Sequence, residues 1–189
     1  LVSDAREGGV RIIGPNCFGI INTDPVVRLN AMPGSLIERH GPVAFVSQSG
    51  ALAEAVVAWA QEQGIGFSKF VSIGNMSDVD FAEMMLYLVD DPQTKVIAMY
   101  AEGIKDGRKF MEAAKAVTAK KPIIVLKAGR YDTATRAVIS HTGSLAGSDQ
   151  VCDAAFRQCG IIRVDGIEEL FDVSRAIAFQ PPAKSRRVG

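Results

Sequence analysis

The chain has 189 residues, of which 48% are apolar, so it can form one sizeable hydrophobic core and does not have the composition of a disordered protein. Its 21 basic residues balance 21 acidic ones, and no basic block precedes residues 184–187, so charge gives no reason to expect a nucleic-acid or membrane partner. Apolar runs such as residues 96–101 are far shorter than the roughly 20 residues that cross a bilayer, and the first residues do not resemble a secretory signal. We therefore expect a cytoplasmic protein whose partners are small molecules.

The first forty residues show no regular alternation of strands and helices. The run Val10–Ile13 is followed by Gly14-Pro15-Asn16 and by an irregular stretch through Met32-Pro33-Gly34. We interpret residues 1–40 as the tail of a preceding domain and the exit from it.

From Pro42 onward, short apolar runs alternate with segments of helical periodicity. The predicted strands cover residues 43–46, 67–73, 95–101, 122–127 and 161–164. The first predicted helix covers residues 50–64 and the last includes residues 167–177. Three further helices between them are predicted to begin at Ser77-Asp78, at Asp106 and at Ser148-Asp149. The residues expected to face the core are Leu52, Val56, Trp59, Ala60, Phe81, Met84, Met85, Leu88, Phe110, Ala114, Val117, Val151, Ala155, Phe156, Ile167, Leu170, Phe171, Ser174 and Ile177.

Five strands that are each followed by a helix require a parallel sheet covered on both faces, and the nearly continuous apolar strand runs agree with such burial. We predict an α/β fold with a flavodoxin-like, doubly wound, parallel five-stranded sheet in the order 2-1-3-4-5. This domain is expected to cover residues 41–180, and residues 181–189 are expected to link it to a following domain. The chain begins without a methionine and ends as if approaching another strand, so we expect a piece of a larger protein.

Three cysteines, Cys17, Cys152 and Cys159, do not have the spacing of metal ligands, so we expect no metal site. If Cys152 and Cys159 share a helix, they lie about 10.5 Å apart along its axis, which is too far for a disulfide. We expect all three to fill the core.

Ligands of an open parallel sheet bind beyond the carboxyl ends of the strands, where the strand order reverses. For the predicted order, this crevice lies between residues 47–50, after the first strand, and Glu102-Gly103, after the third. The loop after the fourth strand, residues 128–147, is unusually long for a compact domain and adjoins the same edge. Three polar segments should therefore converge there.

His141 lies in this long loop, within the small-residue stretch 140–147. A neutral imidazole can attack phosphorus, since its pKa is about 6.5, and Gly143 and Ser144 let the backbone approach a phosphate closely. A lone histidine is more often a plain polar loop residue, so this interpretation depends on the rest of the chain.

Ser49 and Gly50 open a predicted helix, whose free amides and positive dipole end would suit a phosphate. Helix capping alone explains Ser49 equally well. Glu102 ends an apolar strand at the same edge, where its carboxylate could accept the imidazole N–H and set the tautomer. A solvated strand end is the alternative.

Several short segments occur in the order and spacing of nucleoside-diphosphate-forming acyl-CoA synthetases, relatives of the succinyl-CoA synthetase α subunit. The chain resembles this family over nearly its whole length. The segments are Gly14-Pro15-Asn16, Met32-Pro33-Gly34, 46–50, Gly74-Asn75, 90–94, Glu102-Gly103 and 140–147. His141 is followed by Thr142-Gly143-Ser144, where succinyl-CoA synthetase has Ala-Gly-Ala. The chain is thus closer to the ADP-forming acetyl-CoA synthetases, which argues against succinate as substrate.

The resemblance implies that His141 is phosphorylated, that Glu102 holds it and that the helix beginning at Ser49-Gly50 helps to bind the phosphate. It also implies that Asn16 and the turn containing Pro33 and Gly34 lie near the junction with a CoA-binding domain.

The same resemblance implies an acid–thiol ligase that interconverts acyl-CoA, phosphate and a nucleoside diphosphate with acid, CoA and a nucleoside triphosphate. Mg-ATP or ADP would be bound by a separate ATP-grasp domain or subunit, so we expect this chain to be inactive alone. The acyl group, the nucleotide and a homo- or hetero-oligomeric state stay open.

Two other functions are alternatives for a chain with this pattern. A silent, synthetase-like module that senses acyl-CoA, as in some protein acyltransferases, would not need His141 and Glu102. A flavodoxin-like FMN carrier would need an aromatic pair around the flavin, and the loops offer only Tyr131.

Overall fold

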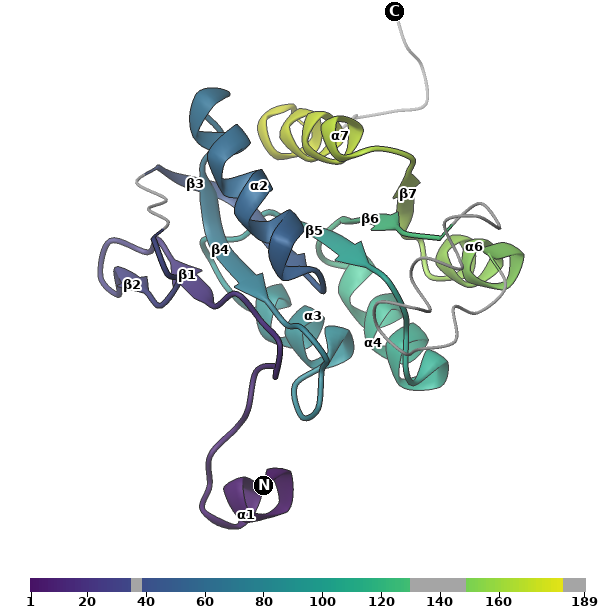
Figure 1. The fold of residues 1–189 in the computed structure, drawn as a ribbon. Helices are drawn as coiled ribbons and strands as arrows, with labels where there is room; N and C mark the ends of the chain where they lie inside the picture. The colour runs from purple at the N-terminus through teal and green to yellow at the C-terminus, as the bar shows by residue number, and fades with distance from the viewer. Residues whose placement is uncertain (35–38, 130–148, 182–189) are drawn as a thin grey trace, which may run out of the picture.

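The computed structural model describes residues 1–34, 39–129 and 149–181, and Figure 1 shows their arrangement. The described strands form one sheet in the order β2-β1-β4-β3-β5-β6-β7. The strands are β1 (Ile20–Asn22), β2 (Leu29–Asn30), β3 (His40–Ser47), β4 (Phe67–Ser72), β5 (Val96–Ala101), β6 (Ile123–Lys127) and β7 (Ile162–Val164). The helices are α1 (Val2–Glu7), α2 (Gly50–Glu62), α3 (Phe81–Val89), α4 (Gly107–Thr118), α6 (Asp149–Gln158) and α7 (Ile167–Phe179).

The central strands β4-β3-β5-β6-β7 are all parallel, and their order is the predicted 2-1-3-4-5. In the middle of the sheet Val46 of β3 lies opposite Val71 on one side and Met99 on the other. The flavodoxin-like, doubly wound fold class is therefore confirmed. Reversal of strand order on either side of β3 places the crevice at the carboxyl ends of β3 and β5.

The sheet differs from the predicted five parallel strands because the described residues add two strands, which pair antiparallel. β1 pairs antiparallel with β4, with Ile20 opposite Val71, and β2 pairs antiparallel with β1. The first forty residues, expected as an irregular exit from a preceding domain, thus add two strands to this sheet. The three-domain division itself stays a prediction, and residues 182–189 lie outside the described part.

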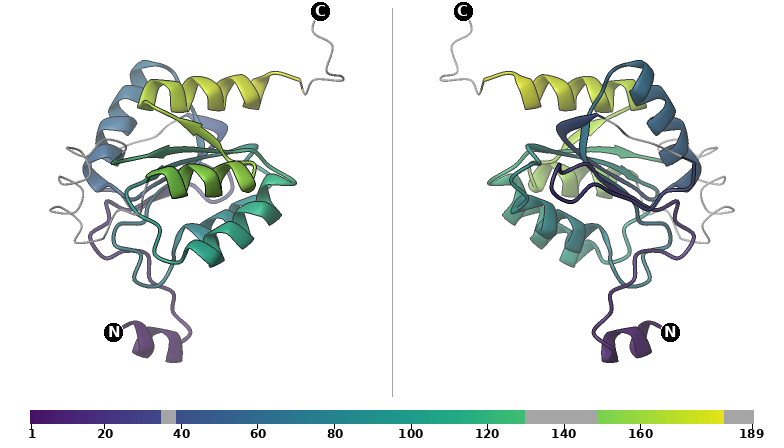
Figure 2. Two further views of the ribbon diagram at one scale, coloured as in Figure 1. Left: turned by 90° about the vertical axis from the view of Figure 1, so that its right-hand side faces the viewer. Right: turned by 90° about the vertical axis from the view of Figure 1, so that its left-hand side faces the viewer.

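Helices cover both faces of the sheet, with α2 and α7 on one side and α3, α4 and α6 on the other (Figure 2). Aromatic rings fill the core between the sheet and helices α2 and α7, where the ring centroids of Phe45 and Phe70 are 5.0 Å apart. Most predicted inward residues are buried, including Phe156 of α6, but the prediction for Val151 on the same helix was wrong, since this side chain is 67% exposed. Of the three cysteines, Cys159 is buried, Cys152 is partly buried and Cys17 is exposed, so the expectation for Cys17 was wrong.

Polar side chains start three of the helices by accepting the first free amides. Ser49 caps α2 through the amide of Leu52, and Asp106 caps α4 as predicted. The second predicted helix was expected to begin at Ser77-Asp78, but the corresponding helix, α3, begins at Phe81 and its cap is Asp80. Asp78 cannot serve as the cap because its carboxylate binds the N-terminal segment.

A buried polar cluster lies where β4 meets the turn before β5. The ammonium of Lys69 is 2.9 Å from Oδ2 of Asp91, and both side chains are almost fully enclosed. The Thr94 hydroxyl donates to the same oxygen and is 2.7 Å from the Ser68 hydroxyl. The family-like segment 90–94 therefore contributes to the fold at a place remote from the carboxyl edge.

None of the helices in the described ranges is long and apolar enough to span a membrane.

Candidate functional site

The loops after β3 and β5 are joined directly by the side chain of Gln48. Its Oε1 accepts hydrogen bonds from the amide of Glu102 at 2.9 Å and from that of Gly103 at 3.0 Å. The amide of Gln48 itself donates to the Tyr100 carbonyl at 3.1 Å. Two of the three segments predicted to converge thus do so at the carboxyl edge of the sheet.

Ser49 and Gly50 lie at the start of α2 on this edge. The Ser49 hydroxyl accepts from the Leu52 amide at 3.3 Å, while the Ser47 hydroxyl donates to the Ser49 carbonyl at 2.8 Å. No described residue accepts a hydrogen bond from the amides of Gly50 or Ala51. These two amides and the positive end of the helix dipole can therefore receive an anion.

Packing against the described residues does not require glycine at position 50. A Cβ there would lie 3.6 Å from the Cβ of Phe18, an ordinary contact. The absence of a side chain at Gly50 is instead what close approach by a ligand to these amides would need.

Glu102 follows β5 directly and is only 9% exposed. Burial, together with the charge of Glu102, raises the pKa of the Tyr100 phenol. A carboxylate enclosed beside the end of β5 can accept a hydrogen bond from an imidazole and hold it in one tautomer. The alternative of a solvated strand end does not fit this burial.

Sequence reasoning overlooked two polar residues at this edge. Lys127 ends β6, lies opposite Ala101 of β5 and is buried, and this burial lowers the pKa of its ammonium. A charged residue closing an apolar strand run is the same signal that identified Glu102, so Lys127 could have been found. The role of Gln48 depends on the register of β3 and β5, which the sequence does not display.

His141, Gly143 and Ser144 lie outside the described residues. The structure does place the two ends from which their loop departs. The last residue of β6 is Lys127, next to β5 and Glu102, and α6 begins at Asp149. Asp149 is held by the guanidinium of Arg163 on β7.

Asn16 also lies at the carboxyl edge, beyond the end of β4. The amide of Asn75 donates to the Pro15 carbonyl at 2.9 Å, and the side chains of Asn16 and Asn75 are 3.4 Å apart. Gly74, at φ 51°, makes this approach possible, since a Cβ there would be 2.3 Å from the carbonyl oxygens of Pro15 and Asn16. Lys105, after β5, fixes the same turn by donating to the Asn75 carbonyl.

Pro33 and Gly34 are exposed and follow β2. The amide of Ala31 bonds to the carbonyl of Ile20, whose partner in β4 is Val71. Because β2 runs toward the carboxyl end of β4, this turn and Asn16 occupy the same edge of the sheet.

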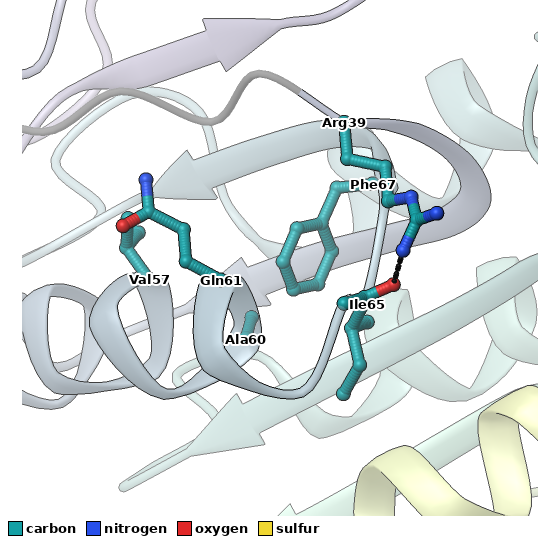
Figure 3. Close-up of a pocket in the computed structure, with 7 residues that line it drawn as sticks. Arg39, Val57, Ala60, Gln61, Ile65 and Phe67 are labelled. Carbon is teal, nitrogen blue, oxygen red and sulfur yellow. Dashed lines mark hydrogen bonds between the residues drawn. The ribbon is translucent and has the colours of Figure 1, made fainter.

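A separate cavity of about 370 Å³ lies at the opposite, amino edge of the sheet (Figure 3). It is lined by the last turns of α2 and by Phe67, and Arg39 closes one side by donating to the Gly64 carbonyl at 2.7 Å. It is at the far end of α2 from Ser49 and contains none of the predicted site residues. The described residues contain no group of three or more acidic, cysteine or histidine side chains that could hold a metal ion.

The fold and this edge define a flavodoxin-like domain in which the segment that carries the buried Glu102 is hydrogen-bonded to Gln48, just before the start of α2. The chain belongs to the family of the succinyl-CoA ligase-like flavodoxin domain, whose model matches residues 40–177.

Several relatives of the chain are named as ADP-forming ligases. The chain is 52% identical over its full length to acetate–CoA ligase [ADP-forming] II subunit alpha of Pyrococcus furiosus, and spans 40% of that subunit. It is 42% identical to 4-hydroxybutyrate–CoA ligase [ADP-forming] of Nitrosopumilus maritimus, with 96% of the chain and 26% of the relative covered. The resemblance to ADP-forming acyl-CoA synthetases is thus confirmed.

A solved structure agrees with these relatives. Acetyl-coenzyme A synthetase 1 of Ca. Korarchaeum cryptofilum, in complex with phosphate and ADP, matches with a TM-score of 0.91 and 41% identity. The match covers 99% of this chain and 40% of that one. These relatives do not favour the alternative of a silent acyl-CoA-sensing module.

Proposed function

We propose that this chain is the phosphohistidine-carrying domain of an ADP-forming acyl-CoA synthetase. The observation that carries the proposal is the pairing of Glu102 with the open start of α2, joined by Gln48, beside the strand from which the His141 loop departs. Two of the relatives named above are ADP-forming ligases, and the similar acetyl-coenzyme A synthetase 1 was solved with phosphate and ADP.

The proposed reaction has three group transfers. A phosphate oxygen attacks the thioester carbonyl, the C–S bond breaks, and CoA leaves with formation of an acyl phosphate. An imidazole nitrogen of His141 then attacks phosphorus, and the P–O bond to the acid breaks. Finally, a β-phosphate oxygen of ADP attacks the phosphohistidine, and the P–N bond breaks to give ATP and free imidazole.

Each of the proposed site residues has a role in these reaction steps. Glu102 accepts the imidazole N–H and leaves the other nitrogen of His141 free to attack. The amides of Gly50 and Ala51, which follow the cap residue Ser49, act together with Gly143 and Ser144 to neutralise the charge of the phosphoryl oxygens. Alignment of this kind supplies much of the rate of phosphoryl transfer.

Other parts of the parent enzyme complete the proposal. CoA or acyl-CoA binds in a CoA-binding domain next to Asn16, Pro33 and Gly34, and a separate ATP-grasp domain holds Mg-ATP or ADP. The chain spans about 40% of the α subunit that it matches, which leaves room for such domains. The complete enzyme works in the cytoplasm as a homo- or hetero-oligomer.

Phosphorylation of His141 can be tested in the complete synthetase with radiolabelled ATP and Mg²⁺. Labelling should be acid-labile and alkali-stable, and should vanish in His141→Asn. The second histidine offers a matched control, because His40 lies at the amino edge, where it contacts Thr23 and Gln93. His40→Asn should retain the label, and persistent labelling of His141→Asn would refute the proposal.

A further inference from the structure

We infer that Gln48 is a positioning residue, which holds Glu102 in place relative to the phosphate-binding end of α2. The inference rests on the proposed function, since it concerns the residue that orients His141. Its side chain links the two loops directly, through the amides of Glu102 and Gly103.

The side chain of Gln48 continues the hydrogen bonding between the β3 and β5 segments beyond the last paired residues of the two strands. The β3–β5 pairing ends at Ser47 opposite Tyr100, followed by the bond from the Gln48 amide to the Tyr100 carbonyl. Glu102 and Gly103 follow directly after the last residue of β5, Ala101. The Gln48 Oε1 continues the link between the two segments by accepting hydrogen bonds from both of their amides.

One acceptor atom with two donors fixes the turn. A carboxamide oxygen has two lone pairs, and here both are used by consecutive amides, so the peptide planes of Glu102 and Gly103 are oriented together. Because Gln48 immediately precedes Ser49, the same residue determines the spacing between Glu102 and the first turn of α2. A shift of about 1 Å between such groups can cost about 100-fold in rate.

The neutral charge of the Gln48 carboxamide matters for this role as much as the length of the side chain. Two successive amides form a concavity that ordinarily attracts an anion. Gln48 fills it with a neutral oxygen, so the phosphate is left to the amides of Gly50 and Ala51. A carboxylate in its place would put a second negative charge beside Glu102 and the phosphate, and would disfavour the ionised form of Glu102.

Two substitutions separate these effects. Gln48→Met keeps the length of the side chain and removes the acceptor, whereas Gln48→Glu keeps the acceptor and adds charge. The described groups whose charges interact with Glu102 include Tyr100 and Lys127, and both are retained in the two variants. Gln63→Met is the matched control, because Gln63 is exposed at the opposite end of α2.

The test is the rate of histidine phosphorylation of the complete synthetase by Mg-ATP, measured from pH 5 to 9. Gln48→Met should lower the maximal rate by roughly 10–100-fold without changing the KM for ATP, whereas Gln63→Met should match the wild type. Gln48→Glu should remain folded, with the acid side of its pH–rate profile moved to higher pH. A wild-type rate in Gln48→Met, or a wild-type profile and rate in Gln48→Glu, would overturn the inference.

Parallel variants distinguish this failure from failure of the proposed function. If His141→Asn abolishes labelling while Gln48→Met is normal, only the role of Gln48 is wrong. If His141→Asn is still labelled, the proposed function itself is wrong. Should Gln48→Met fail to fold, the pH profile of Gln48→Glu still decides the question.

Discussion

The carboxylate of Asp78 forms an ion pair with Arg11, with 2.9 Å between Oδ2 and Nε. Its other oxygen accepts from Arg6, and the amide of Ile12 donates to Oδ2 at 2.8 Å. Both arginines belong to the N-terminal segment, whose helix α1 has no buried residue. Asp78 therefore ties a segment with little apolar contact to the turn before α3.

This tie predicts a specific pH dependence of stability. The hydrogen bond from Arg11, followed by those from Ile12 and Arg6, holds the pKa of Asp78 well below its usual range. A carboxylate with a depressed folded pKa stabilises the fold above its unfolded pKa of about 3.9, and this contribution is lost as the pH falls through the folded value. Asp78→Asn should lower the thermal midpoint at pH 7, and its difference from the wild type should shrink below pH ~4.

Thermal unfolding at several pH values, followed by circular dichroism, measures this difference. Asp90→Asn is the control, because that side chain is 80% exposed and its nearest ammonium, that of Lys120, is 3.7 Å away. A pH-independent difference between Asp78→Asn and the wild type would contradict the assignment.

The buried pair of Lys69 and Asp91 gives a second prediction. Burial raises the pKa of Asp91, but hydrogen bonds from Lys69 and Thr94 outweigh this effect and lower it, so the carboxylate is charged. Lys69→Met should reduce the free energy of unfolding by about 3–5 kcal/mol, since it leaves this charge uncompensated. Denaturant unfolding measures the loss, and Lys69→Met/Asp91→Leu should recover part of it. A double variant less stable than the single one would argue against charge as the cause.

The parallel part of the fold could be predicted because each of its strands and helices leaves a signal in its own short stretch of sequence. Apolar runs fixed the positions of five strands, and helical periodicity with a cap such as Asp106 located the helices between them. The strand order was then taken from the flavodoxin-like architecture that this alternation indicates. β1 and β2 were missed because they have only three and two residues and owe their conformation to pairing, β1 with β4 and β2 with β1.

Errors arose where a distant residue decided the outcome. Ser77-Asp78 has the composition of a helix start, yet Asp78 is taken by arginines about 70 positions earlier in the chain. For the candidate site, topology predicted that Glu102 and Ser49 would share an edge. The acceptor that joins them, Gln48, could be recognised only from the register of the strands. The roles of His141, Gly143 and Ser144 stay predictions.

Glu102 should be needed for fast phosphorylation but not for folding. Glu102→Gln keeps the shape of the side chain and the backbone bond to Gln48 but removes the negative charge that would orient His141. We expect the phosphorylation rate to fall by about 10²–10⁴-fold, as for loss of a general base or its orienting partner. Rapid-quench labelling measures the rate, and Glu112→Gln on the exposed face of α4 is the control. Equal rates in the two variants would exclude Glu102 from this role.

Gly50 should be needed for phosphate rather than for folding. Alanine at this position meets only ordinary contacts, so Gly50→Ala should leave the thermal midpoint nearly unchanged, whereas Gly50→Val places a branched side chain over the free amides. Hydrogen bonds to charged groups contribute about 1.5–3 kcal/mol, so Gly50→Val should raise the KM for phosphate by roughly 10–100-fold in the direction of ATP synthesis. Gly107 is the matched control, because it is likewise the first residue of a helix and a Cβ there meets nothing within 4 Å. If Gly107→Val raises the KM for phosphate as much as Gly50→Val does, the start of α2 is not the phosphate site.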